Sequence, residues 1–101
     1  MTGIEHTRSN KDSLSVVTSV LNEEDSVQEL VDRTLGALKE SGHPHELIIV
    51  NDGSTDATLP LLLKLSEKYA ELRIIDLLRN FGVMAAVTAG VSVAKGAAVI
   101  V

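Results

Sequence analysis

Four short apolar segments alternate with longer amphipathic segments along this chain, and this alternation restricts the fold more than any other feature. The apolar segments cover residues 14–20, 46–50, 72–77 and 97–101. Each is rich in Val, Ile or Leu, too short for a buried helix, and typical of strands that are buried on both faces. Because parallel strands need crossover connections, the pattern predicts a β-α-β-α-β-α-β order around a parallel sheet.

The segments between these strands have sequence patterns typical of helices. Ser26 and Glu29 form a Ser-x-x-Glu capping box, so we expect each side chain to bond the other residue's backbone N–H. The first helix then carries one apolar stripe, made of Val27, Leu30, Val31, Leu35 and Leu38. We expect a third helix over 83–95 and a second over 56–69, whose apolar face consists of Leu59, Leu62, Leu63 and Leu65. The predicted fold class is α/β, with a Rossmann-like parallel sheet.

The length of 101 residues allows one modest domain. Residues 1–13 mix charged and small polar side chains without the apolar core of a secretory signal, so we expect them to form a flexible N-terminal tail. Residues 14–101 are expected to form the folded part. The last apolar segment runs to Val101 without a turn or a polar tail, and we therefore expect a fragment that is truncated after the fourth strand.

Charge and composition exclude several classes of partner. The net charge is −5 and no cluster of Lys and Arg is present, so neither nucleic acid nor an anionic membrane surface is expected as a partner. Cysteine is absent, which excludes disulfides and thiolate metal sites. Residues 83–101 are apolar but are interrupted by Thr88, Ser92 and Lys95, so we expect a helix and a strand there and no transmembrane segment.

Polar clusters follow the first three predicted strands, at the sheet edge where ligands gather in folds of this kind. These clusters run from Asn22 to Asp25, from Asn51 to Asp56 and from Arg79 to Gly82. Loops and helix caps are polar in any protein, so each cluster alone has a structural interpretation as well as a functional one. Three such clusters at one edge favour a ligand site.

The second cluster divides into two parts. Gly53 permits a tight turn, and Ser54, Thr55 or Asp56 can cap the helix that follows. These structural roles leave Asp52 without a task, so we interpret its carboxylate as a contact to a nucleoside, as the acidic residue of dinucleotide folds bonds ribose. On this interpretation, replacing Asp52 by alanine costs nucleotide affinity and little stability, whereas replacing Gly53 by valine costs the fold.

Several familiar catalytic devices are absent from the sequence. No Gly-x-Gly-x-x-Gly follows the first strand and no Gly-Lys-Ser/Thr phosphate loop occurs, which excludes the usual dehydrogenase and NTPase sites. The chain also has no Gly-x-Ser-x-Gly elbow and no Cys-His pair. Covalent catalysis therefore has no candidate nucleophile.

Taken in order, the three clusters resemble motifs of family 2 glycosyltransferases with the GT-A (nucleotide-diphospho-sugar transferase) fold. The first motif is matched by Asn22-Glu23-Glu24 and the second by Asp52 to Asp56. The third, Arg-Asn-x-Gly before a helix of small residues, is matched from Arg79 onward. The sequence is similar in particular to polyprenyl-phosphate sugar transferases such as dolichol-phosphate mannosyltransferase, over residues 14–101.

The resemblance implies that residues 14–101 are the N-terminal, nucleotide-sugar-binding part of a glycosyltransferase domain. The complete enzyme, a hexosyltransferase, is expected to pass a sugar from a nucleoside diphosphate sugar to an acceptor, for which the resemblance suggests a polyprenyl phosphate, that is, a lipid phosphate. The residues expected to bind the nucleotide sugar are Leu21, Asn22, Glu23, Asp52, Gly53, Ser54, Arg79, Asn80 and Gly82.

The family's metal-binding Asp-x-Asp follows the fourth strand, so the resemblance places the metal ligands just after Val101. We expect Mg²⁺ or Mn²⁺ as the cofactor of the complete enzyme, but no metal bound by this chain, no catalytic residue within it and no useful turnover. The expected location is the cytoplasm, or the cytoplasmic face of a membrane for a longer protein. The oligomeric state is left open.

The chain departs from the family pattern at four positions. Ser19 stands in place of a proline, Leu21 of a tyrosine, Asn51 of an aspartate and Val83 of a frequent lysine. These changes remove an aromatic ring and two charges, so a second interpretation is a non-catalytic nucleotide-binding or interaction module with a degenerate site. A flavodoxin-like or receiver domain is the third, and the receiver is disfavoured because Asp76 lies inside the predicted third strand instead of at its end.

Overall fold

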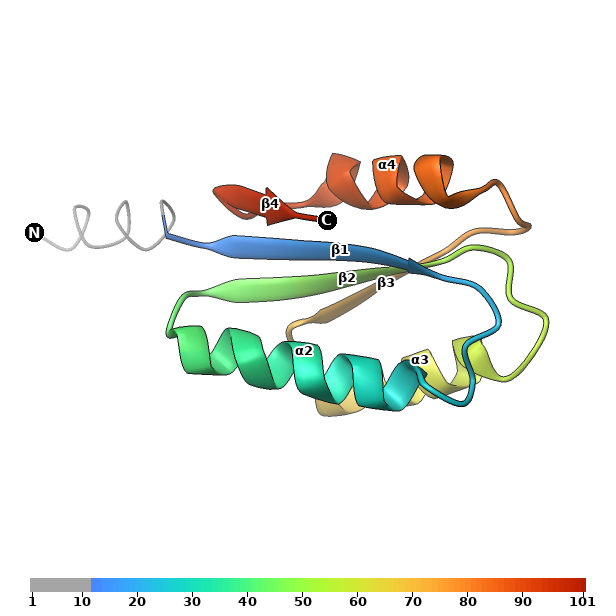
Figure 1. Ribbon diagram of the computed structural model, residues 1–101, viewed down its shortest axis with the longest axis horizontal. Coiled ribbons are helices and arrows are strands. Elements are labelled where there is room, and N and C mark those ends of the chain that lie inside the picture. Colours follow the sequence, from blue (N-terminus) through green and yellow to red (C-terminus); the bar gives the residue numbers. More distant parts are fainter. Residues whose placement is uncertain (1–11) are drawn as a thin grey trace, which may run out of the picture.

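The computed structural model describes residues 12–101, which form one parallel sheet between two helical layers (Figure 1). The strands are β1 (Leu14–Val20), β2 (His45–Asn51), β3 (Leu72–Asp76) and β4 (Ala98–Ile100). They are arranged in the order β3-β2-β1-β4, and every neighbouring pair is parallel. The predicted α/β fold class is therefore confirmed. The strand order reverses beside β1, which is where ligands bind in open α/β sheets.

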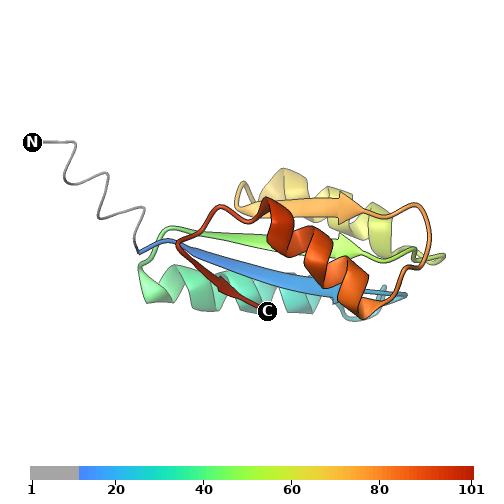
Figure 2. The ribbon, with the colours of Figure 1, turned by 90° about the horizontal axis from the view of Figure 1, so that it is seen from above.

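Three helices connect the strands. Helices α2 (Val27–Ser41) and α3 (Thr58–Lys68) lie side by side on one face, and among residues 12–101 the other face carries α4 (Val83–Val93) (Figure 2). The element order agrees with the sequence pattern, and most boundaries agree within two residues. The third strand ends at Asp76, so this residue is not inside the strand as the sequence suggested.

The two faces of β2 divide the core. Leu47 and Ile49 point into a large cluster with α2 and α3, while Ile48 and Val50 point into a smaller one under α4. The predicted helix faces are partly wrong, because Leu30 and Leu63 are 36% and 52% exposed. In α3 the buried residues are Thr58, Leu62 and Leu65.

Helix α4 approaches the sheet closely because its buried residues are small. Ala86 and Gly90 are the buried residues of this helix. A Cβ atom on Gly90 would lie 2.4 Å from Cγ1 of Val17 and 3.1 Å from Cγ2 of Val50. A larger residue here would push α4 off β1 and β2.

The predicted capping box at the start of α2 does not form. The Ser26 hydroxyl donates to Oε2 of Glu23 at 2.8 Å, and no side chain caps the helix. The backbone N–H of Val27 bonds the carbonyl of Glu23 at 2.8 Å instead. Glu29 turns outward and lies 3.6 Å from Arg33, one helical turn away.

Glu46 joins several elements at the amino ends of the strands. Its Oε2 accepts hydrogen bonds from the Ser15 hydroxyl at 2.6 Å and from the backbone N–H of Lys95 at 2.7 Å. Its Oε1 lies 2.7 Å from the guanidinium of Arg73, which also donates to the carbonyl of Val93 at 3.0 Å. The same carboxylate thus ties β1, β2, β3 and the end of α4.

The predicted tail lies mostly outside the described residues, since residues 1–11 are not covered. Ser13, which the sequence assigned to that tail, contacts the start of β4. Its hydroxyl accepts the N–H of Ala97 at 3.0 Å, and its carbonyl accepts the N–H of Ala98 at 3.2 Å. Within residues 12–101, none of the helices has the length and apolar character needed to span a bilayer.

We expect Glu46 to contribute stability that depends on pH. Burial raises the pKa of its carboxyl group, but the bonds from Ser15, Lys95 and Arg73 outweigh burial and hold the pKa below the ordinary glutamate value. The contribution is therefore complete above the unfolded-state pKa and is lost as the pH falls through the folded-state pKa, below about pH 5. Urea unfolding across this range measures it.

The matched variant is Glu46→Gln. It should lose about 1–3 kcal/mol of unfolding free energy at neutral pH and should show a flatter acid dependence than the parent. An acid dependence of the variant as steep as that of the parent would show that other carboxylates cause it.

Candidate functional site

The three polar loops meet at the carboxyl ends of the strands, at the right of Figure 1. Backbone bonds continue the sheet into these loops, because Asp52 N–H donates to the carbonyl of Val20 at 2.9 Å and Leu77 N–H to that of Asn51 at 3.0 Å. The predicted juxtaposition of the three clusters is thus present. Side chains then determine how the loops are held.

Asn22 connects the first loop to the second. Its side-chain Oδ1 accepts the backbone N–H groups of Thr55 at 2.8 Å and Asp56 at 3.3 Å, and its own N–H donates to Oγ of Ser54 at 2.9 Å. Asn22 adopts a positive φ of 53°, a conformation that asparagine tolerates better than most residues. This side chain is therefore engaged by the protein itself.

Asp56 and Thr58 complete the same connection. The N–H of Glu23 donates to Oγ1 of Thr58 at 2.8 Å, and the N–H of Glu24 donates to Oδ2 of Asp56 at 3.2 Å. Asp56 Oδ1 accepts the N–H of Thr58, the first residue of α3, at 2.9 Å. Loss of hydration raises the pKa of Asp56, but the bonds from Thr58 and Glu24 outweigh it and leave the pKa below its ordinary value.

Asp52 connects the second loop to the third. The side chain is buried, with the residue 3% exposed. Its Oδ1 accepts the N–H of Phe81 at 2.8 Å, and its Oδ2 accepts the N–H of Gly82 at 3.1 Å. The amide of Asn80 lies 3.3 Å from the carbonyl oxygen and 3.4 Å from Oδ2 of the same residue. The sequence interpretation that gave Asp52 no structural task is therefore wrong.

Gly53 makes room for this connection. It has a φ of 80°, and a Cβ atom there would lie 2.4 Å from the backbone nitrogen of Asn80 and 2.5 Å from the carbonyl carbon of Arg79. The second and third loops thus touch backbone to backbone. Only glycine fits both the conformation and the space.

Asn51, where the family pattern has an aspartate, bonds sideways to the neighbouring strand. Its Nδ2 donates to Oδ1 of Asp76 at 3.0 Å, and its Oδ1 accepts the Ser54 hydroxyl at 2.5 Å. An aspartate at position 51 would place a second carboxylate at hydrogen-bonding distance from Asp76. The departure from the family pattern therefore has a local electrostatic reason.

The charges around the edge are unequal. Glu23, Glu24 and Asp25 are exposed in the first loop, and the sole basic residue of the three loops is Arg79. The guanidinium of Arg79 lies 5.0 Å from the ring centroid of Phe81, which is 51% exposed. A diphosphate approaching this edge would meet one cation and several carboxylates.

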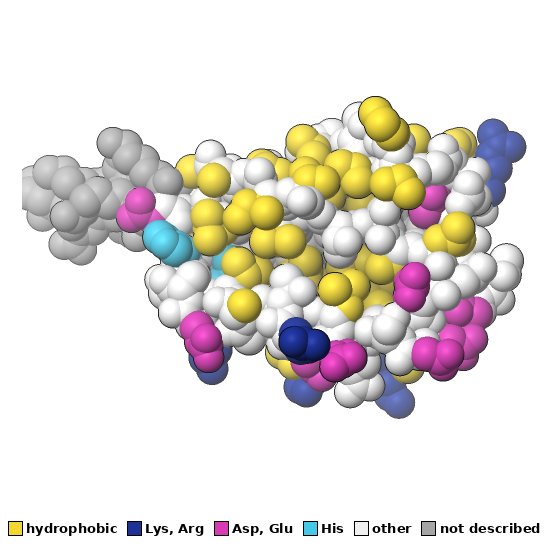
Figure 3. Space-filling view, viewed as in Figure 1, with side chains coloured by type: hydrophobic (Ala, Val, Ile, Leu, Met, Phe, Trp, Pro, Cys, Tyr) yellow, Lys and Arg dark blue, Asp and Glu magenta, His cyan; other side chains and the backbone are white. Residues whose placement is uncertain are grey.

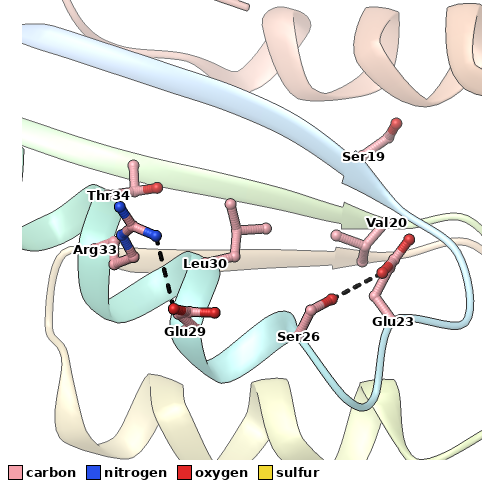
Figure 4. A pocket seen from close by; sticks show the side chains of 8 residues that line it. All are labelled: Ser19, Val20, Glu23, Ser26, Glu29, Leu30, Arg33 and Thr34. Carbon is pink, nitrogen blue, oxygen red and sulfur yellow. Dashed lines mark hydrogen bonds and ion pairs between the residues drawn. The ribbon is translucent and has the colours of Figure 1, made fainter.

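A cleft of about 440 Å³ adjoins the first loop, between the end of β1 and the first turns of α2 (Figure 4). Its volume falls in the range of small-molecule sites. The lining residues are Ser19, Val20, Glu23, Ser26, Glu29, Leu30, Arg33 and Thr34. Figure 4 shows the Glu29–Arg33 and Ser26–Glu23 pairs along its wall, while Ser19 points toward α4. Of the predicted site residues, Glu23 alone lines this cleft, so it is a neighbour of the edge and not its centre.

The structure brings all nine predicted residues to one edge but gives them different tasks. Side chains or glycine contacts hold the loops together at Asn22, Asp52, Gly53, Ser54 and Asn80. Gly82 N–H is bonded by Asp52. Leu21, Glu23 and Arg79 remain exposed. Thr58 was not predicted as a site residue, although Asp-x-Thr is a spacing at which an aspartate side chain bonds the backbone two residues on.

Metal-binding geometry is not found in the described chain. Among residues 12–101, no three His, Asp or Glu side chains come together in a group that could hold a metal ion. The carboxylates at the edge accept N–H or hydroxyl donors instead, as Asp52 and Asp56 do. We therefore assign no step of chemistry to a metal bound by these residues.

Comparison with known proteins gives a consistent result. The family model described as "Glycosyl transferase family 2" matches residues 15–101. The chain is 48% identical over 84 residues to dodecaprenyl-phosphate galacturonate synthase of Rhizobium johnstonii, a match that covers 82% of this chain and 25% of that protein. It is 40% identical over 85 residues to undecaprenyl-phosphate 4-deoxy-4-formamido-L-arabinose transferase of Salmonella paratyphi A, covering 82% and 26%.

Solved structures agree with the sequence matches. The fold is similar to TarS 1-349 of S. aureus, with a TM-score of 0.66, 28% identity and coverage of 83% of this chain and 25% of that one. One such structure of TarS is in complex with UDP. The chain spans about a quarter of the length of the curated relatives that it matches.

We expect Asp52→Asn to lower the unfolding free energy by about 2–3 kcal/mol, because an amide cannot accept both N–H groups and leaves one buried donor unpaired. Chemical unfolding measures this loss. Asp76→Asn is the matched control at the same edge, since its remaining oxygen still accepts from Asn51, and it should lose less than about 1 kcal/mol. Equal small losses in both variants would contradict a structural role for Asp52.

We expect Gly53→Ala to destabilise the chain by more than about 3 kcal/mol, because a strained conformation and a backbone clash add together. Gly82→Ala separates the two causes. Gly82 also has a positive φ, 98°, with a ψ of 158°, but a Cβ atom there meets nothing within 4 Å, so its loss should stay within about 1–3 kcal/mol, the cost of the conformation alone. Similar losses in the two variants would argue against the contact with Asn80.

Proposed function

The chain belongs to glycosyltransferase family 2, and from this premise we propose that it forms the donor-nucleotide-binding part of an enzyme that transfers a sugar from a nucleoside diphosphate sugar to an acceptor. One observation carries the proposal. Three motifs separated by about 30 residues are held by hydrogen bonds into one edge, whose three loops contain Arg79 as their sole basic residue. The UDP complex of the similar TarS structure supports a nucleotide as the ligand.

The exposed side chains determine which contacts are open to a donor. Glu23 lines the cleft at the end of β1, and the exposed Leu21 precedes it by two residues, so we assign the base and ribose to this side. Arg79 is assigned to the diphosphate, because a guanidinium can bond two phosphate oxygens at once. Asp52 acts in this proposal as a positioning residue that fixes the Arg79 loop, and not as the direct contact that the sequence suggested.

The acceptor is proposed to be a polyprenyl phosphate. Two relatives carry dodecaprenyl-phosphate and undecaprenyl-phosphate in their names, at 48% and 40% identity. In the transfer, an acceptor oxygen attacks the anomeric carbon of the sugar and the nucleoside diphosphate leaves. A lipid acceptor implies that the complete protein works at a membrane, and we propose its cytoplasmic face.

A divalent cation is proposed to neutralise the diphosphate in the complete enzyme. Glu23, Glu24 and Asp25 repel an uncompensated diphosphate, and Arg79 alone cancels only part of its charge. Mg²⁺ or Mn²⁺ would supply the remaining positive charge and withdraw electrons from the leaving group. In this proposal the roles of the described residues are to bind and orient the nucleotide.

A second candidate function is a nucleotide-binding or interaction module without catalysis. Both carboxylate oxygens of Asp52 accept backbone N–H groups, and no three His, Asp or Glu side chains come together among the described residues. Leu21 also offers no ring against which a base could stack. These observations favour weak, metal-independent binding by the chain on its own.

Calorimetric titration of UDP, GDP and dTDP, with and without Mn²⁺, tests the proposal. One of the three nucleotides should bind, and Arg79→Gln should weaken that binding about tenfold, because a charge-assisted bond to phosphate is lost. Lys64→Gln on α3 is the matched control and should leave binding unchanged. Binding that needs Mn²⁺ supports the donor site, whereas metal-independent binding supports the module. Absence of binding for all three nucleotides would contradict both.

A further inference from the structure

Alternate side chains of β2 lie under helix α4. Because side chains alternate along a strand, Glu46, Ile48, Val50 and Asp52, which follows the strand, share one face of the sheet. Ile48 and Val50 pack against Ala86 of α4 on that face. Glu46 and Asp52 therefore stand at the two ends of an apolar pair, about 20 Å apart at about 3.3 Å per residue.

Each of these two carboxylates holds one end of α4. Asp52 accepts the N–H groups of Phe81 and Gly82, just before the first residue of the helix. Glu46 accepts the N–H of Lys95, just after the last turn, at 2.7 Å. The helix is about 16 Å long at about 1.5 Å per residue, and the bonded residues lie beyond its two ends. The length of α4 thus matches the spacing of the two carboxylates.

The sheet also supplies the charges that the dipole of α4 favours at its ends. The helix has no acidic residue in its first turn and no basic residue in its last turn, and Figure 3 shows a largely hydrophobic region over it, with most acidic side chains in view over the lower half. Asp52 places an anion at the N-terminus. At the C-terminus the guanidinium of Arg73 donates to the carbonyl of Val93 at 3.0 Å, and Glu46 holds that guanidinium at 2.7 Å.

Side-chain packing between α4 and the sheet is sparse. The buried residues of this helix are Ala86 and Gly90, and small residues make few dispersion contacts. Gly90 lies flat against the sheet, because a Cβ atom there would be 2.4 Å from Cγ1 of Val17. Packed helices can slide or tilt by small amounts on such a contact. The position of α4 on the sheet therefore depends on the bonds at its two ends.

We propose that Glu46 is a positioning residue for the third loop, on which it acts through α4 from about 20 Å away. A helix with intact hydrogen bonds keeps its length. Loss of the bonds at its C-terminal end therefore lets the whole helix tilt and weakens the Asp52 bonds at its other end. Arg79 precedes those bonds by two residues. The consequence for a nucleotide rests on the proposed donor site, whereas the coupling between the two ends of α4 goes beyond it.

Amide hydrogen exchange, followed by NMR on the 101-residue chain, tests the coupling. Glu46→Gln should speed exchange of the Phe81 and Gly82 amides by about fivefold or more, which is the lower end of typical coupling between distant sites. A residue with a merely local structural role would alter exchange at Lys95 and leave the distant amides unchanged. Faster exchange at Lys95 with unchanged exchange at Phe81 and Gly82 would therefore overturn the proposal.

Two further variants separate coupling from a general loss of stability. Arg73→Gln removes the cation from the C-terminal end of α4 and should also speed exchange at Phe81 and Gly82. The Arg73 side chain is 37% exposed, so this variant should fold, which circular dichroism checks, and it decides the test if Glu46→Gln does not fold. Tyr69→Phe is the matched control, because it removes the bond to Asp32 on the other face of the sheet. Equal acceleration by Tyr69→Phe would overturn the proposal.

A double-mutant cycle gives a second measurement. Sites more than about 10 Å apart usually have additive effects on unfolding. If both carboxylates hold the same helix, Glu46→Gln should raise the unfolding equilibrium constant less in an Asp52→Asn background than in the parent, by about threefold or more. Equal increases in the two backgrounds would overturn the proposal. Neither experiment contains a nucleotide, so failure of the titration leaves the coupling untouched, and absence of coupling leaves the proposed donor site untouched.

Discussion

The buried carboxylate of Asp52 is the interaction on which the arrangement of the candidate site depends. A charge with 3% exposure needs partners, and the backbone N–H groups of Phe81 and Gly82 supply them where α4 begins. These N–H groups belong to a helix start, whose dipole also favours a negative charge. The adjacent Gly53 removes the side chain that would block the approach. The second loop therefore contacts the third for two reasons: the Asp52 carboxylate bonds N–H groups of the third loop, and Gly53 has no side chain to keep the two backbones apart.

A second set of bonds, centred on Asn22 and Asp56, holds the first loop to the second in the same way. Most polar residues of the three motifs are consequently engaged by the protein, and a ligand meets the few side chains that are left over. Loss of activity after mutation of Asn22 or Ser54 would therefore report on loop geometry first. Direct contact is better sought at the exposed side chains of Leu21, Glu23 and Arg79, although Glu23 also accepts the Ser26 hydroxyl.

The fold was predictable because its signals are local. Residue alternation, turn residues and helical spacing each act within about ten positions, and they gave the order of all seven elements. The predictions that were wrong depend on competition between hydrogen-bond partners or on residues that lie far apart in the sequence. Ser26 bonds the nearby Glu23 carboxylate in preference to a helix cap. Leu30 is exposed because the buried side of α2 is narrower than its apolar stripe and consists of Val27, Val31, Leu35 and Leu38. At the site, the edge was predictable from strand direction, but the partners of Asp52 lie about 30 residues away, and spacing along the chain carries no information about them.

The net charge of −5 likewise does not tell how the charged residues are distributed in the fold. Summed over the chain, the charge predicts repulsion from an anionic surface. The fold separates its contributions, because the crossover through α4 lies on one face of the sheet while α2 and α3, with Glu29, Asp32, Glu40 and Glu67, lie on the other. The segment from Leu77 to Val101 contains two cationic residues and no acidic residue. Its helix, α4, covers one face of the sheet. Electrostatic attraction falls off within a Debye length, so the charges nearest to a ligand govern its approach, and beside α4 those charges are Arg79 and Lys95.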